Sequence, residues 1–291
     1  MNIYIETDPQ LELETLSPVR KFFDIFWLTF LNSLPKSAGK LIKKTHKSAK
    51  EVMENKANHK ALEVLYKKPH THYAKNILQK FFRYVWFNLH NSKAIRNRLK
   101  IVKREIKNTI FKIDKASDDI SILSIASGSA RAIFEALQQV DLEKNKVKVL
   151  FLDKNPEALE YSQGLRKELL PTFTSAKWVE DTASNFKNYF EKPNSIDLIE
   201  MVGLLDYFDE EKIVTLLSSL YEYLSEGGTL ITANVTPNKE EPFITKVIDW
   251  QMIYKTPEKF IELAERAGFK KENIKAIYEP IKIHIILVMK K

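Results

Sequence analysis

The sequence ISILSIASGSAR, at residues 120–131, contains the transition that decides the fold: a strand, a turn and the start of a helix. The apolar and β-branched residues from 120 to 126 are typical of a buried strand. Residues 127–129 form a turn of small side chains, and residues 130–140 repeat apolar side chains at helical spacing. Backbone amides at such a turn suit a carboxylate or a phosphate, although an ordinary strand-to-helix turn has the same pattern.

Strand and helix patterns alternate from this point to the C-terminus. Further strands are predicted at 147–152, 176–179, 195–202, 229–235, 274–278 and 281–289. Helices are predicted after Asn155, from Asp209 to the Gly227-Gly228 pair, and from Thr256 to Gly268. This order predicts an α/β fold with a Rossmann-like, doubly wound, seven-stranded sheet that is mostly parallel and has a terminal antiparallel strand. Polar residues at the carboxyl ends of the strands should then line one crevice.

Composition divides the 291-residue chain near residue 118. Residues 1–119 contain 24 Lys and Arg against 12 Asp and Glu, whereas residues 120–291 contain 22 against 26. We therefore expect a helical, basic N-terminal domain or lid at 1–117 and an α/β domain at 118–291. The chain has no cysteine, which excludes disulfides, thiol nucleophiles and Cys-ligated metals, and no metal site is predicted.

The N-terminal residues do not have the pattern of a secretory leader, because acidic residues replace the expected basic cluster. The most apolar run, residues 22–34, contains Asp24 and is shorter than the ~20 residues that a membrane-spanning helix needs. A cytoplasmic location is therefore expected.

Polar residues at the ends of the second and third predicted strands suit a nucleoside ligand. Asp153 ends the second strand, where a carboxylate usually accepts hydrogen bonds from ribose hydroxyls. Asp181 and Thr182 follow the third strand and suit the edge of adenine. The G-x-G-x-x-G pattern of a pyrophosphate site is absent, and an acidic-aromatic loop at 203–208 follows the fourth strand. These features favour a sulfonium cofactor over a dinucleotide.

Several segments carry a resemblance to a known family. They are ISILSIASGSAR, LDKNPEALEYS, DLIEMVGLLDYF, LSEGGTLITANVTP, DWQMIYKTPEKFIELAERAGF and SKAIRNRLKIV. Residues 118–291 resemble the class I S-adenosylmethionine-dependent methyltransferases. From about residue 66 onward the chain resembles the bacterial methyltransferases of extracellular-factor (3-hydroxy fatty acid methyl ester) biosynthesis. It departs from that family at 126–129, which read Ala-Ser-Gly-Ser, and at 70–74, which read His-Thr-His-Tyr-Ala.

The resemblance implies S-adenosylmethionine as the cofactor and a role for each residue of the crevice. Residues expected to bind the cofactor are Ser127, Gly128 and Ser129 at its methionine end, Asp153 and Lys154 at the ribose, Asp181 and Thr182 at adenine, and Gly203 and Leu204 beside the sulfonium. Residues expected to bind the acceptor are Tyr73, Arg96, Arg98, Asn234 and Trp250, and the candidate catalytic residues are Tyr207, Asp249 and Tyr254.

The chemistry of methyl transfer limits what the acceptor requires. A carboxylate is already anionic, whereas an amine or a hydroxyl needs a base to remove its proton. No obvious base is present, because His70 and His72 are weak candidates and His284 is expected to be structural. Arg96 and Arg98 could bind an acceptor carboxylate, the cofactor carboxylate or an acid of the neighbouring domain. We expect a small-molecule acceptor, either a carboxylate or an acyl-chain compound.

Lysines of the basic half recur at helical spacing. Lys36, Lys40, Lys43, Lys47 and Lys50 would share one face of a single helix. The simplest interpretation is that this face is exposed to solvent. It also suits an acidic carrier protein, an anionic membrane surface or, less well, nucleic acid. The alternatives to a small-molecule methyltransferase are therefore an RNA methyltransferase and a non-catalytic module that retains the cofactor fold.

Overall fold

The computed structural model describes residues 3–67, 77–114, 119–140, 147–170 and 175–291. The N-terminal part of the chain forms β1 (Tyr4–Ile5), η1 (Pro9–Leu11), α1 (Pro18–Ser33), α2 (Ala38–Thr45), α3 (Lys47–Glu54), α4 (His59–Lys67), α5 (Ile77–Phe87) and α6 (His90–Asp114). They continue with β2 (Ile120–Ile125), α7 (Arg131–Leu137), β3 (Val147–Asp153), α8 (Pro156–Leu169), β4 (Ser175–Glu180), η3 (Ala183–Tyr189), β5 (Ile196–Val202) and η4 (Leu205–Tyr207). The C-terminal part contains α9 (Glu210–Tyr223), β6 (Leu224–Val235), α10 (Glu241–Lys246), α11 (Pro257–Arg266), η5 (Lys271–Asn273), β7 (Ile274–Tyr278) and β8 (His284–Lys290).

The sheet has eight strands in the order β1-β7-β8-β6-β5-β2-β3-β4. Only β8 runs antiparallel to its neighbours β6 and β7, and the other pairs are parallel. The chain moves outward from β2 through β3 to β4 and then returns to β5 on the other side of β2. This reversal makes the carboxyl ends of β2 and β5 the place where a doubly wound sheet binds its ligand. The α/β fold class is confirmed.

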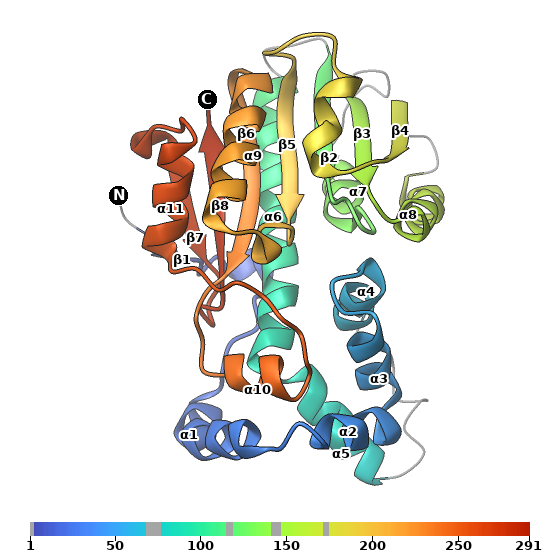
Figure 1. Cartoon of the computed structure of the whole chain (residues 1–291), viewed down its shortest axis with the longest axis vertical. Helices are drawn as coiled ribbons and strands as arrows, with labels where there is room; N and C mark the ends of the chain where they lie inside the picture. Colours follow the sequence, from blue (N-terminus) through green and yellow to red (C-terminus); the bar gives the residue numbers. More distant parts are fainter. Residues whose placement is uncertain (1–2, 68–76, 115–118, 141–146, 171–174) are drawn as a thin grey trace.

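Helices cover both faces of the sheet (Figure 1). One core cluster packs the sheet against α9 and α11, and a second packs it against α6 and α7. Three helices begin as the sequence predicts, because Asn155, Asp209 and Thr256 each accept a hydrogen bond from a backbone amide of the first turn. The strongly apolar strand residues are buried between the two layers of helices, as in other parallel sheets.

A separate cluster of helices lies beyond the carboxyl ends of the strands. Helices α1 to α5 and α10 share a third core, which includes Leu31, Val52, Leu65, Trp86 and Ile244. Figure 1 shows this helical end of the molecule facing the arrowhead of β5, with α6 running from it along the sheet. We refer to α1–α5 and α10 as the helical cap.

The structure differs from the sequence predictions at three places. The sheet has an eighth strand, because Tyr4–Ile5 pairs with β7 at one edge. The Gly227-Gly228 pair does not end α9, which stops at Tyr223; the two glycines lie inside β6 instead. The lysine face predicted for one helix is divided between α2 and α3, because the chain turns at His46, whose ring nitrogen caps α3.

Candidate functional site

A cavity of about 760 Å³ lies between the sheet and the helical cap. Its sheet side is formed by the residues that follow β2, β3, β4 and β5, which is where the strand order reverses. Its opposite side comes from α3, α4, α5 and α10. The volume is in the range of about 300–1,000 Å³ that holds a cofactor or a drug-sized ligand. Two sequence regions that are distant along the chain therefore build one site.

The turn after β2 forms one corner of the cavity. Ala126, Gly128 and Ala130 all have positive φ, so the turn alternates between left-handed and ordinary backbone. The Gly128 amide donates to Asp153 Oδ2 at 2.8 Å, and the Asn155 amide donates to Oδ1 at 2.9 Å. Because a carboxylate offers about four acceptor positions, Asp153 keeps capacity for two further donors. The carboxylate both fixes the turn and borders the cavity.

Five further predicted cofactor residues border the same cavity: Lys154, Asp181, Thr182, Gly203 and Leu204. Asp181 lies after β4, and its carboxylate accepts hydrogen bonds from Tyr189, Asn185 and the Thr182 amide. These donors, Tyr189 first, lower the pKa of Asp181. Gly203 follows β5 with φ of +92°, and a Cβ at that position would point into open space. The fit to S-adenosylmethionine therefore rests on a carboxylate at Asp153, a polar edge at Asp181 and free space at Gly203.

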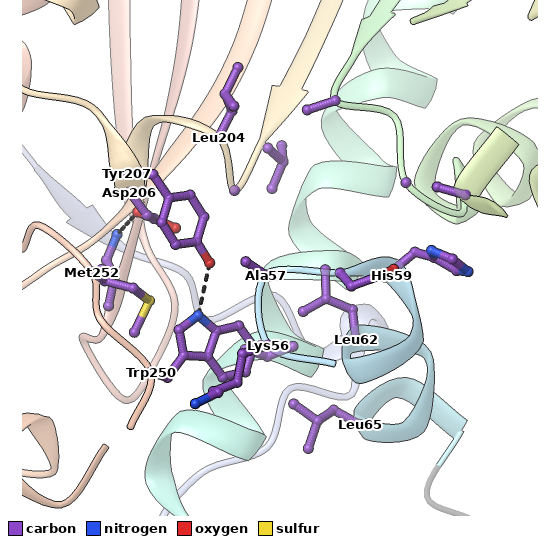
Figure 2. A pocket seen from close by; sticks show the side chains of 18 of the residues that line it. Lys56, Ala57, His59, Leu62, Leu65, Leu204, Asp206, Tyr207, Trp250 and Met252 are labelled. Carbon is purple, nitrogen blue, oxygen red and sulfur yellow. Dashed lines mark hydrogen bonds between the residues drawn. The ribbon is translucent and has the colours of Figure 1, made fainter. Parts of the chain in front are cut away.

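An aromatic pair forms the wall beside this free space. The Trp250 indole donates to the Tyr207 hydroxyl at 2.8 Å, which joins the loop after β5 to the segment after α10. Figure 2 shows the pair facing Leu62 and Leu65 of α4 across the cavity. Burial raises the pKa of Tyr207 to about 12, so its hydroxyl is neutral at physiological pH.

Two buried charged residues, Arg98 and Asp206, line the cavity, and a third, Glu200, lies near Arg98 without lining it. Arg98 of α6 is only 3% exposed and lies near Tyr66, and its Nε has no partner among the described residues. Glu200 and Asp206 are also buried, and burial raises the pKa of both, to about 7 for Glu200. The positive charge of Arg98 opposes this rise in each case. The cavity therefore holds a buried guanidinium with unused donor capacity.

Away from the strand ends the cavity becomes apolar. This part is lined by Val52, Leu62, Leu65, Trp86, Leu89, Ile95, Ile244, Ile248 and Met252. Most of these side chains belong to the core of the helical cap, so the cavity extends toward its interior. An apolar channel that starts at a guanidinium matches an amphiphile with an anionic head.

Some predicted site residues lie outside the lining. Arg96 donates through two nitrogens to Glu14, at 2.5 and 2.8 Å, which is an acid of the same N-terminal region rather than of the neighbouring domain. Asp249 is half exposed and binds Lys56 at 3.0 Å. Asn234 and Tyr254 lie next to the cavity without lining it, as do Ser127 and Ser129. Tyr73, His70 and His72 lie outside the described residues.

Two histidines that sequence reasoning did not assign to the site line the cavity. His59 of α4 is buried beside the Gly128 turn, and His284 begins β8. Both rings lack a hydrogen-bond partner among the described residues, and burial lowers the pKa of each. His284 was predicted to be structural because it lies on a strand. The site position of His284 follows from the structure, in which its pairing with Val235 places it at the end of a strand.

Comparison with known proteins agrees with this geometry. The family model described as "Putative methyltransferase" matches residues 58–279. A structure from Bordetella parapertussis described as an exported protein has a TM-score of 0.63 at 17% identity, covering 80% of this chain and 79% of that one. The magnesium protoporphyrin IX methyltransferase of Synechocystis PCC 6803 with bound SAH has a TM-score of 0.51 at 12% identity, covering 74% and 87%. Among curated proteins, none matches this chain.

The matched residues make up most of the chain, and they span the elements from α4 to β7. The fold is that of the class I S-adenosylmethionine-dependent methyltransferases. The chain belongs to the methyltransferase family whose model it matches, and the predictions of an enzyme and of this cofactor are confirmed. Within the described residues, the helices are too short or too polar to cross a membrane.

Proposed function

We propose that this methyltransferase transfers the methyl group of S-adenosylmethionine to the carboxylate of a small acyl-chain compound. The observation that carries the proposal is Arg98, a buried guanidinium that lines the cavity and whose Nε has no partner in the part of the chain that the structure describes. A buried charge without its full set of partners is costly unless a ligand completes them. The resemblance to the extracellular-factor methyltransferases supports the same acceptor class.

The cofactor would lie along the carboxyl ends of the strands. Asp153 would accept from the ribose hydroxyls, and the Gly128 turn would lie beside the methionine end. Asp181 and Thr182 would border adenine. Gly203 and Leu204 would leave room for the sulfonium, because a side chain at Gly203 would occupy the space in front of β5.

The acceptor would enter from the helical cap with its chain in the apolar channel. Arg98 would hold its carboxylate, and the Tyr207–Trp250 pair would confine it against the sulfonium. Bound S-adenosylmethionine supplies an electrophilic methyl carbon, and the electron pair of the broken carbon–sulfur bond remains on sulfur. The protein mainly aligns the two reactants, since a carboxylate oxygen needs no deprotonation. Tyr207 and Tyr254 would act as neutral hydroxyls, because burial raises the pKa of each to about 12.

The test combines cofactor binding with an acceptor series. Calorimetry should detect S-adenosylhomocysteine binding to the folded protein, and labelled methyl groups should appear in base-labile esters of aliphatic acids. The matched alcohols and amides should accept none. Arg98→Met should raise KM for the acid at least about tenfold, the order expected for a lost charge-assisted hydrogen bond, while S-adenosylhomocysteine affinity stays unchanged.

A matched control separates the two arginines of α6. Arg96→Met removes a guanidinium that pairs with Glu14 outside the cavity, so it should lower stability without selectively raising KM. Transfer to alcohols but not to acids would contradict the carboxylate proposal. It would direct attention to His284, whose buried neutral ring could accept a proton.

A further inference from the structure

One side of α1 presents a row of apolar side chains to solvent, beside the exposed polar residues Thr29 and Ser33. These side chains recur three and four residues apart, so they project from a single face of the helix. They are Val19, Phe22, Phe23, Phe26 and Phe30. Phe22 is 73% exposed and Phe26 is 72% exposed, whereas Leu28 and Leu31 on the opposite side are buried in the protein. Exposed phenylalanines in such a row mark an interaction surface rather than ordinary surface composition.

A second apolar row lies on α5. Ile77, Phe81 and Tyr84 are exposed and are separated by four and three residues. Figure 1 shows α1, α2 and α5 together at the end of the molecule farthest from the sheet. We call the exposed residues of α1 and α5, with the lysines of α2 and α3, the basal surface.

The charge around these rows is mainly positive, although α3 also carries the exposed acids Glu51 and Glu54. Residues 25–50 contain no Asp or Glu and six lysines, of which Lys36, Lys40, Lys44 and Lys50 are among the exposed ones. Residues 77–90 also contain no acidic residue, and they include Lys80 and Arg83. Lys36 also lies 3.7 Å from Asp249, but the lysines outnumber the acids, so the basal surface combines aromatic side chains with a net positive charge.

We propose that the basal surface binds the face of an anionic lipid bilayer. Phenylalanines can insert among the acyl chains near the headgroups while lysines on flexible stems reach the lipid phosphates. A symmetric contact with a second copy fits less well, because it would bring the lysines of one copy close to those of the other. A bilayer supplies both the apolar layer and the negative charge that the surface requires.

The basal surface is also connected to the cavity through the helical cap. The buried side of α1 contributes Leu31 to the same core as Ile244 and Ile248, which line the apolar channel. Docking on a bilayer would therefore place the channel close to the membrane. The proposal does not depend on the identity of the methyl acceptor, because it rests on exposed residues outside the cavity.

Vesicle sedimentation with the full-length protein tests the proposal. The protein should sediment with vesicles that mix phosphatidylcholine and phosphatidylglycerol, and much less with phosphatidylcholine alone. Salt at about 0.5 M should weaken binding about tenfold or more, because it screens exposed charges. The double variant Phe22→Ser/Phe26→Ser should lose about tenfold or more in partitioning, because two apolar side chains no longer insert. The double variant Lys40→Gln/Lys44→Gln should lose the preference for anionic lipid.

Two control variants make the outcome specific. Phe111→Ser removes an exposed phenylalanine near the other end of α6, and Lys270→Gln/Lys271→Gln removes two exposed lysines next to the sheet. Both should bind vesicles as the unmodified protein does, and all variants should melt cooperatively and bind S-adenosylhomocysteine. Failure of the unmodified protein to bind mixed vesicles at low salt would overturn the proposal. A dimer that depends on Phe22 and Phe26 would overturn it in favour of self-association.

Discussion

The buried carboxyl group of Glu200 shows how exclusion of solvent controls ionisation close to the site. Its side chain accepts from Ser124 at 2.6 Å, and Arg98 supplies the neighbouring positive charge. Burial outweighs the hydrogen bond and the positive charge, and it raises the pKa of Glu200 from 4.5 to about 7. Near neutral pH the charge of Glu200, which lies near Arg98 without lining the cavity, therefore depends on pH.

Glu200→Gln should reveal this titration as a change in stability with pH. The folded protein holds the proton more tightly than the unfolded chain, so the contribution of Glu200 is complete below pH 4.5 and is lost as pH rises to about 7. In urea unfolding, the free energy of unfolding of the variant, relative to that of the unmodified protein, should therefore rise across this window by at most about 3 kcal/mol.

A second variant defines the upper end of that pH window. Ser124→Ala removes the hydrogen bond that favours the ionised form of Glu200, so the loss of stability should extend to higher pH. A difference between Glu200→Gln and the unmodified protein that does not change with pH would contradict this account.

The position of the turn after β2 was predictable because its sequence signal is local. Gly128 and Asp153 occupy the turn and strand end that any doubly wound sheet places at its ligand site, and the structure joins them by a hydrogen bond. His59 carries no such signal, because its position depends on how α4 packs over the turn. Arg98 and Arg96 could not be separated from the sequence, since only the fold shows that Glu14 reaches one and not the other.

At the level of elements, α4 connects the helical cap to the sheet through one buried acid. Glu63 accepts from Arg131 Nε at 2.8 Å and Nη2 at 2.6 Å, and from the Tyr161 hydroxyl at 2.8 Å. Burial alone would raise the pKa of Glu63, but the hydrogen bonds and charge of Arg131 lower it below its usual value. This carboxylate holds α4 against both α7 and α8.

Glu63→Gln should destabilise the protein by about 1–3 kcal/mol, the cost of weakening a buried, charge-assisted pair. Urea unfolding at neutral pH measures the change. The matched control is Glu157→Gln, which removes an exposed carboxylate that pairs with Lys60 between α8 and α4. That variant should change stability little, because exposed ion pairs contribute little. Equal effects of the two substitutions would show that the buried contact does not hold α4.

At the scale of the whole molecule, the sequence predicts the class of the sheet better than its edges. The buried strands β2, β3, β5 and β6 are apolar and lie in strand–helix alternation, which predicts a doubly wound, mostly parallel sheet. β1 has only two residues and is stabilised by pairing with β7, at the other end of the chain. The path of α6 along the sheet likewise depends on tertiary packing, because its helical pattern alone does not indicate which surface it covers.

Because the sheet and the helical cap each supply walls of the cavity, a bound ligand should couple their stabilities. S-adenosylhomocysteine at about 100 times its Kd should raise the free energy of unfolding by about 2.7 kcal/mol. Hydrogen exchange should slow in α4 and around Gly203 together, since both border the cavity, while α11 on the outer face should be protected only through the global increase. Protection confined to the strand ends, with α4 exchanging as before, would mean that the cofactor touches the sheet alone and that the cap serves only the acceptor.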